Sequence, residues 1–148
     1  TDLLANGSSS RLISKLVNED SSFVSIDAYV YGTSEPGLLF IEGQPSEDIT
    51  LEEAEKLIWA EIDKLKAQPI PEEELVTQLN KVRTNLILSE TSVLGKTMSL
   101  AYYELLKDID LINKEDDIYG AVTAAKIQDQ ANSILTKDNC CTVYYKQN

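Results

Sequence analysis

A nine-residue alternation followed by a short turn is the feature that most restricts the fold of this chain. Apolar and polar side chains alternate from Phe23 to Tyr31, which is typical of a strand with one buried face. Residues 32–37 contain Pro36 between two glycines and predict a turn, and residues 38–42 form a second, apolar strand. Because the connection is short, we expect an antiparallel hairpin. One face of the first strand would carry Val24, Ile26, Ala28 and Val30. The other face would carry Ser25, Asp27, Tyr29 and Tyr31.

Two helices are predicted directly after the hairpin. Thr50 and Glu53 have the spacing of a capping box, and apolar residues then recur at helical spacing until the helix ends before Pro69. Pro71 suits the first position of a second helix. The glutamates at 72–74 favour the same helix start, because carboxylates are stabilised near a helix N-terminus.

The elements that follow are shorter. Residues 91–93 interrupt the second helix, and another helix is expected over residues 94–107. The remaining elements are a connection at 109–113, helices at 114–121 and 124–135 with Thr123 as a cap, and a closing strand at 140–145. This order predicts an α+β fold in which several helices cover an antiparallel sheet.

Length and charge restrict the class of protein. The chain has 148 residues, of which 43% are hydrophobic, and no linker or internal repeat divides it, so we expect one domain. A net charge of −12 argues against nucleic acid or an anionic membrane as a partner. No apolar run reaches the roughly 18 residues that a membrane span needs. We expect a soluble protein with solvated acidic faces; an acidic patch that recruits basic peptides is the alternative.

The residues that usually bind metals or perform catalysis are scarce. The chain has no histidine, and its two cysteines are adjacent. Neighbouring strand residues point to opposite faces, so Cys140 and Cys141 are poorly placed to bond each other, and we expect one of them to be buried. The acidic residues at 108–110 and 115–117 suit a hard cation, but without the glycine of a calcium loop we interpret them as solvated loops. We therefore expect no catalytic residue and no metal ligand in this chain.

The N-terminal stretch combines a turn with the start of a helix. Asn6 and Gly7 tolerate positive φ angles. The serines at 8–10 can accept hydrogen bonds from the first free amides of a helix. Leu12 and Leu16 then follow at helical spacing. Taken alone, this pattern indicates only a short capped helix.

Several motifs in a fixed order resemble the pitrilysin/insulinase family of zinc peptidases, which includes the mitochondrial processing peptidases. They are Ser9-Ser10-Arg11-Leu12 after an apolar strand end, residues 49–58, residues 69–75, residues 121–128 and residues 141–145. The resemblance covers nearly the whole chain and corresponds to the last two thirds of one half-molecule. It implies that Thr1 lies inside a longer chain, whose preceding part supplies at least one more strand and its helices.

The resemblance also implies two similar halves, carried on one chain or on two. One half holds zinc through His-x-x-Glu-His and a distant glutamate, and the other has the same fold without zinc. This chain has no histidine and cannot supply the motif. It would therefore be the non-catalytic half-domain, with zinc in the catalytic partner half and a peptide substrate between the two.

The family pattern is degenerate at the positions that assist catalysis. In many members the non-catalytic half contributes an arginine and a tyrosine that hold the substrate carbonyl. These positions fall near Val17 and Val24, and the glycine between them falls near Ser21. Valine cannot donate a hydrogen bond to an oxyanion, so the resemblance does not carry the assisting role to these residues. Arg11 matches the helix start of the family and would bond nearby backbone or carboxylates.

Two functions fit these observations. The first is a domain that encloses and positions peptides for a separate catalytic half, with Tyr29 and Tyr31 as the candidate substrate contacts. In a lone domain the same tyrosines would simply meet helices. The second is a degenerate member that works as a binding or assembly scaffold without peptidase activity. A metal-free hydrolase with its own nucleophile would lack a general base.

Overall fold

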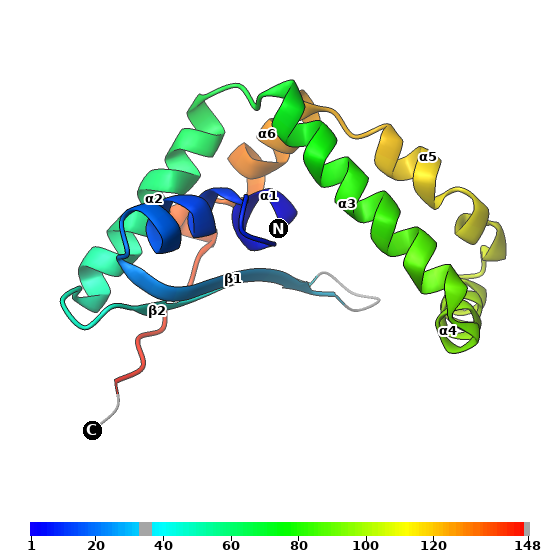
Figure 1. The fold of residues 1–148 in the computed structure, drawn as a ribbon, viewed down its shortest axis with the longest axis horizontal. Helices are drawn as coiled ribbons and strands as arrows, with labels where there is room; N and C mark the ends of the chain where they lie inside the picture. The colour runs from blue at the N-terminus through cyan, green and yellow to red at the C-terminus, as the bar shows by residue number, and fades with distance from the viewer. Residues whose placement is uncertain (33–36, 147–148) are drawn as a thin grey trace. The chain divides into compact units, whose positions relative to one another are not determined.

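The computed structural model describes residues 1–32 and 37–146, without the side chain of Glu90 (Figure 1). The chain divides into two compact units. Unit 1 comprises residues 1–69 and 128–148, and unit 2 comprises residues 70–127. Unit 1 contains the sheet and almost all of the buried apolar residues, whereas unit 2 is built from helices.

Unit 1 places short helices on one side of a hairpin. Its elements are α1 (Asp2–Ala5), the π-helix η1 (Ile13–Glu19), β1 (Phe23–Tyr31), β2 (Leu38–Pro45), α2 (Leu51–Ala67), the C-terminal part of α6 (Ala124–Ile134) and the 3-10 helix η3 (Lys137–Asn139). Helices α1 and η1 contact β1 and lie on the same side of the hairpin (Figure 1). The predicted antiparallel hairpin and the α+β class are confirmed.

A β-bulge at Val24 changes which side chains of β1 are buried. Phe23 lies opposite Pro45, but Ser25 lies opposite Gln44, so Val24 has no partner of its own. An extra residue in one strand shifts the alternation by one position. The buried residues are therefore Phe23, Ile26 and Ala28. The predicted apolar face is wrong at Val24, which is exposed at the bulge. Val30 pairs with Leu39 and lies on the predicted face, but it is exposed toward the end of the hairpin.

The core of unit 1 lies between the hairpin and its helices. Its buried apolar residues are Leu3, Leu4, Ala5, Leu12, Leu16, Phe23, Ile26, Ala28, Ala54, Ile62, Leu65 and Ala131. The resemblance implied a strand end at residues 3–5, and this expectation is wrong because they form α1. The amides of Leu4 and Ala5 bond the carbonyl of Thr1 at 2.8 and 3.0 Å, so the segment satisfies its own backbone.

The turn after α1 has the predicted form. Gly7 has a φ of 91°, which a residue with a side chain rarely adopts. The Ser10 hydroxyl donates to the Gly7 carbonyl at 2.7 Å and thereby closes the turn. The Ser14 amide bonds the Ser10 carbonyl at 2.8 Å, so the next helix starts directly after the serines, as predicted.

Helix α2 has both bonds of the predicted capping box. The Glu53 amide donates to Thr50 Oγ1 at 3.2 Å, and the Thr50 amide donates to Glu53 Oε2 at 3.0 Å. The helix ends at Ala67, before Pro69. On α6, Gln128 Nε2 donates to the carbonyl of Lys66 at 2.8 Å, which ties α6 to the end of α2.

Unit 2 follows the predicted order of helices. It contains α3 (Glu72–Thr91), α4 (Val93–Leu105), the 3-10 helix η2 (Ile109–Asn113), α5 (Glu115–Gly120) and the first residues of α6. Arg83 Nε donates to Asp116 Oδ1 at 2.6 Å and joins α3 to α5. The Tyr103 hydroxyl donates to Glu115 and joins α4 to α5. Among the described residues of unit 2, Ile70 is the one buried apolar side chain.

The C-terminal segment corrects two predictions. Residues 140–146 were expected to contain a strand, but they pair with no other strand among the described residues. Extended backbone becomes a strand only when a partner accepts its hydrogen bonds. Cys140 and Cys141 are both exposed, so neither is buried as predicted. The segment is instead held by its side chains, since Thr142 Oγ1 and the Tyr144 hydroxyl donate to the two carboxylate oxygens of Glu55 at 2.9 and 2.5 Å.

Whether a helix can insert into a membrane depends on its length and its hydropathy. Across residues 1–32 and 37–146, none of the helices is both long enough and apolar enough to cross a bilayer.

Candidate functional site: the outer face of the hairpin

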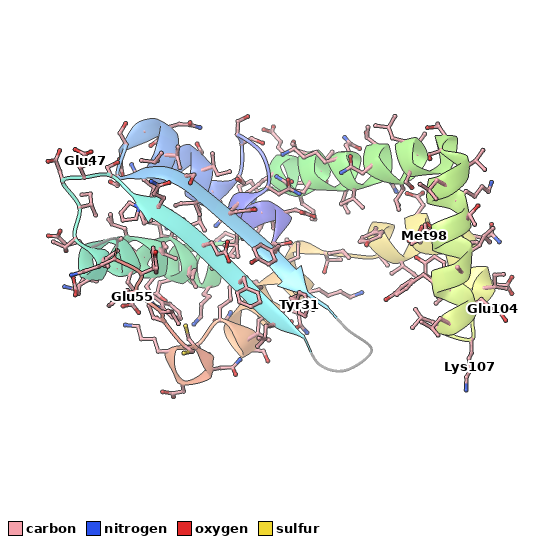
Figure 2. The ribbon with its side chains drawn as sticks, turned by 90° about the horizontal axis from the view of Figure 1, so that it is seen from below. Tyr31, Glu47, Glu55, Met98, Glu104 and Lys107 are labelled. Carbon is pink, nitrogen blue, oxygen red and sulfur yellow. The ribbon has the colours of Figure 1, made fainter. Side chains whose placement is uncertain are left out.

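The hairpin has one face toward α1 and η1 and a second face that no helix covers among the described residues of unit 1. Ile26 and Ala28 point to the covered face and are buried. The residues between them on β1, together with their partners on β2, point the other way. We call this second side the outer face; it comprises Asp27, Tyr29, Tyr31, Leu38, Phe40 and Glu42. Figure 2 views the hairpin with no helix in front of it.

Tyr29 is held at the centre of the outer face. Its ring stacks on Phe40 of β2 with the ring centroids 5.3 Å apart and the planes inclined by 18°. Its hydroxyl donates to Glu42 Oε1 at 2.7 Å. This hydrogen bond raises the pKa of Tyr29 above its ordinary value, so the phenol stays protonated at neutral pH. The result is a fixed aromatic surface of two rings, with a carboxylate beside it.

Tyr31 and Leu38 extend this surface toward the end of the hairpin. They lie opposite each other in the register and are 64% and 63% exposed. Tyr31 projects from β1 in Figure 2. An exposed tyrosine beside an exposed leucine offers apolar area together with a hydroxyl that can donate or accept a hydrogen bond. The outer face therefore suits an apolar or aromatic side chain of a peptide.

The degenerate family positions lie elsewhere in unit 1. Val17 is half-buried on η1, and Val24 is exposed at the bulge of β1. Neither side chain can donate a hydrogen bond. Ser21 has a φ of 51°, so the left-handed backbone that glycine favours is kept although the residue is serine. Phe23 is buried above Gly43, where an added Cβ would lie 2.8 Å from the Phe23 ring.

The residues of this chain do not fit a zinc site. Zinc in proteins is bound mainly by histidine and cysteine together with carboxylates, and the chain has no histidine. In the part of the chain that the structure describes, no three residues among histidine, cysteine, aspartate and glutamate are grouped to hold a metal. The outer face presents two carboxylates, two phenols, a phenyl ring and a leucine side chain.

Sequence patterns identified half of the outer face. Tyr29 and Tyr31 were predicted on one strand face, where the structure places them. Leu38, Phe40 and Glu42 were missed. Every residue from 38 to 41 is apolar, so the sequence pattern did not show which of their side chains share a strand face. The missing information was the register, which pairs Tyr29 with Phe40 and Tyr31 with Leu38.

Comparisons with solved structures identify the same fold in bacterial proteases. The chain superposes on a protease from Helicobacter pylori with a TM-score of 0.83 and 22% identity, over 93% of this chain and 33% of that chain. It superposes on a proposed zinc protease from Bordetella pertussis Tohama I with a TM-score of 0.80 and 21% identity, over 93% of this chain and 75% of that one. The chain thus spans about a third of the length of the H. pylori protease.

A third structure is itself described as an inactive domain. It is the inactive peptidase domain of a proposed zinc protease from Bordetella parapertussis, matched with a TM-score of 0.81 and 19% identity over 99% of this chain and 80% of that one. No curated protein sequence matches this chain significantly. The family model of the peptidase M16 inactive domain matches residues 1–82, which is more than half of the chain. The chain therefore belongs to the peptidase M16 inactive-domain family, which confirms the resemblance seen in the sequence.

Proposed function

We propose that this chain is the non-catalytic half-domain of a zinc-dependent endopeptidase and that its outer face contacts the peptide substrate. The catalytic half, on the same chain or on a partner chain, would carry zinc in a His-x-x-Glu-His motif. The observation that supports the proposal is the outer face itself: an uncovered, largely apolar sheet surface in a domain of an inactive peptidase family. Two of the structural relatives are described as proposed zinc proteases, which agrees with this role.

The chemistry of the outer face favours a particular kind of peptide. Tyr29 and Phe40 form an aromatic platform, and the carboxylate of Glu42 lies beside it. Aromatic and aliphatic side chains can pack on such a platform, and a basic side chain beside them would meet the carboxylate. The second carboxylate of the outer face, Asp27, accepts from the Ala28 amide at 2.8 Å. The proposed substrate is therefore an extended peptide with apolar and basic residues.

A peptidase assay tests this proposal on the full-length protein that contains the chain. Cleavage of an unstructured peptide should require zinc and stop when a chelator is added. The variant Tyr31→Ser should raise KM for a peptide with aromatic residues and leave zinc binding unchanged. Tyr145→Ser is the control, because Tyr145 is a tyrosine of unit 1 that is even more exposed than Tyr31 and is not on the hairpin. An unchanged KM in Tyr31→Ser would contradict the role of the outer face.

The second candidate function is a binding or assembly scaffold without peptidase activity. It is favoured by Val17 and Val24, which replace the arginine and tyrosine of many family members with side chains that cannot hold a carbonyl. A full-length protein that binds no zinc and cleaves no peptide would establish this alternative. Cleavage by the 148-residue chain alone would contradict both functions.

A further inference from the structure

The outer face of the hairpin consists of three rows, each formed by one β1 residue and its partner on β2. The rows are Tyr31 with Leu38, Tyr29 with Phe40, and Asp27 with Glu42. The first two rows are apolar or aromatic, and the third consists of two carboxylates. Neighbouring rows are two residues apart along the strands, which corresponds to about 6.8 Å. The face therefore presents apolar, aromatic and acidic groups in a fixed order and at a fixed spacing.

The carboxylate row places two like charges opposite each other. Asp27 and Glu42 are directly paired in the register, and both are exposed. Side chains in such a pair have Cβ atoms roughly 4.5–5.5 Å apart, and like charges at this distance are destabilising. Among residues 1–32 and 37–146, no lysine or arginine forms an ion pair with either carboxylate. The row therefore carries two negative charges that the described part of the chain does not neutralise.

One oxygen of each carboxylate is engaged in a hydrogen bond that holds the side chain in place. Asp27 Oδ1 accepts from the Ala28 amide at 2.8 Å. Glu42 Oε1 accepts from the Tyr29 hydroxyl at 2.7 Å. The second oxygens, Asp27 Oδ2 and Glu42 Oε2, have no hydrogen-bond partner among the described residues. A cation on the outer face can therefore bind both side chains without displacing the bonds that fix them.

The chemistry of the carboxylate row favours a cationic side chain over a metal ion. Calcium takes about six to eight oxygen ligands, and the row offers only two carboxylates. Within the described ranges, no third potential ligand is grouped with these two to hold a metal. A lysine or arginine side chain needs fewer partners, and a guanidinium group can bond two carboxylate oxygens at once. The aromatic row beside the carboxylates adds a surface on which the carbon stem of such a side chain can pack.

An extended peptide repeats its side chains at the same interval as the rows. Every second side chain of an extended chain points to the same side, about 6.8 Å from the previous one. We propose that the outer face selects peptides in which a basic residue lies two positions from an aromatic or large aliphatic residue. The basic residue lies over Asp27 and Glu42, and the apolar residue lies over Tyr29 and Phe40. This inference rests on the proposed function, because it specifies the peptide that binds to the same face.

Two peptides of identical composition test the spacing. The first, Lys-Ser-Phe-Ser-Lys, has lysine two positions from phenylalanine in either direction of binding, whereas the second, Ser-Lys-Phe-Lys-Ser, has lysine next to it. Both have blocked termini, so their only charges are those of the lysines. Their dissociation constants for the full-length protein would be measured by calorimetry, and mass spectrometry would verify that the peptides stay intact. We expect the first peptide to bind about fivefold more tightly, and this preference to disappear at high salt.

Two variants without the negative charges assign the preference to the carboxylate row. Asp27→Asn and Glu42→Gln each remove one charge but keep an oxygen that accepts the bond from Ala28 or Tyr29. The double variant should bind the two peptides equally. Asp48→Asn is the matched control, because it removes one exposed carboxylate of unit 1 that is not on the hairpin, and it should keep the preference.

The outcomes separate this inference from the proposed function. Equal affinity of the unaltered protein for the two peptides would overturn the inference, and the proposed function would still stand if Tyr31→Ser raises KM. A preference that persists in the double variant would overturn it as well, since another surface would then bind the lysine. Loss of the preference in Asp48→Asn would reveal a general effect of net charge and would also overturn it. A preference in a protein that cleaves no peptide would support this inference while contradicting the proposed function.

Discussion

Unit 1 and unit 2 place their apolar residues in opposite ways. Unit 1 buries them between a hairpin and the helices α1, η1 and α2, and twelve of its apolar residues form a core. Unit 2 contains α3 with 20 residues and α4 with 13 residues, and Ser92 caps α4, but Ile70 is its one buried apolar residue within the described chain. Good local helix signals are therefore not evidence of a local core. A helix can be specified by its own sequence while its large apolar side chains stay exposed, as Leu94, Met98 and Leu105 of α4 do.

The comparison is tested most strongly by truncating one leucine in each unit of the 148-residue chain. Leu12 is fully buried in unit 1, so Leu12→Ala should cost about 2–5 kcal/mol, because it removes apolar contacts and leaves a cavity. Leu94 is exposed on α4, so Leu94→Ala should change the free energy of unfolding by no more than about 0.5 kcal/mol. Urea denaturation followed by circular dichroism measures both. Similar losses in the two variants would mean that unit 2 has a core of its own.

A second comparison substitutes one glycine by alanine in each unit. A Cβ at Gly43 of unit 1 would lie 2.8 Å from Cε1 of the buried Phe23, so Gly43→Ala should cost about 1–3 kcal/mol through overpacking. A Cβ at Gly120 of unit 2 would meet only the tip of Arg83, at 3.3 Å, and that side chain can move aside. Gly120→Ala should leave stability unchanged or raise it by about 0.4–1 kcal/mol. Thermal unfolding of the two variants is the measurement, and a larger loss in Gly120→Ala would contradict the packing described for Gly43.

Removing a helix cap should lower global stability in unit 1 but should affect only the helix itself in unit 2. Thr50→Ala removes the cap of α2, a helix that contributes to the core, and should lower global stability by about 0.5–2 kcal/mol. Ser92→Ala removes the cap of α4, which contributes no buried residue. The second change should speed hydrogen exchange of the first α4 amides and leave the global unfolding midpoint where it was. A shift of that midpoint in Ser92→Ala would show that α4 unfolds together with the core.

The smallest expected effect is at Glu55, which holds the C-terminal segment. Thr142, Tyr144 and the Trp59 indole all donate to its carboxylate. The bond to Glu55 raises the pKa of Tyr144 from 10.0 to about 12. A raised pKa stabilises the folded state below the unfolded value, so this contribution should disappear as the pH rises from 10.0 to about 12. The pKa of Glu55 is lowered, chiefly by its bond to Tyr144, so its contribution is present above the ordinary glutamate range and is lost in acid, as the pH falls through the lowered pKa.

Trp59 reports this contact directly, because it is the single tryptophan of the chain. Its Nε1 donates to Glu55 Oε1 at 3.3 Å. We expect its fluorescence to change between pH 10.0 and about 12, the interval over which Tyr144 loses its proton. Tyr144→Phe should abolish this alkaline transition, whereas Tyr145→Phe, at an exposed tyrosine of the same segment, should keep it. The same transition in both variants would place its origin elsewhere.

Much of the fold could be predicted because its signals are local. The hairpin, the capping box of Thr50 and the limits of α2 to α6 depend on residues within a few positions of each other. The predictions that proved wrong all concern segments whose structure depends on pairing with another strand. Val24 left the expected face because of a bulge in the pairing with β2, and residues 140–146 lack a strand to pair with among the described residues. Residues 3–5 form a turn of helix for the same reason, since they satisfy their backbone locally.

The candidate site was predictable only on one strand. Alternation along β1 placed Tyr29 and Tyr31 together, but alternation along β2 is hidden by its continuous apolar run. The stacking of Tyr29 on Phe40 follows from the cross-strand register, which sequence alone did not fix. The non-catalytic assignment could be made from the sequence. The family resemblance implies that the catalytic half carries a histidine motif, and this chain has no histidine.

The central claim, that the outer face of the hairpin contacts peptide, is tested most directly by photo-cross-linking. A benzophenone amino acid would replace Tyr31 in the full-length protein, and in a parallel sample it would replace Tyr145, which is exposed in unit 1 but not on the hairpin. After irradiation with an unstructured peptide of apolar and basic residues, mass spectrometry would locate the attached peptide. We predict a cross-link from position 31 that excess unlabelled peptide suppresses, and none from position 145. Equal labelling at both positions, or none at position 31, would contradict the claim.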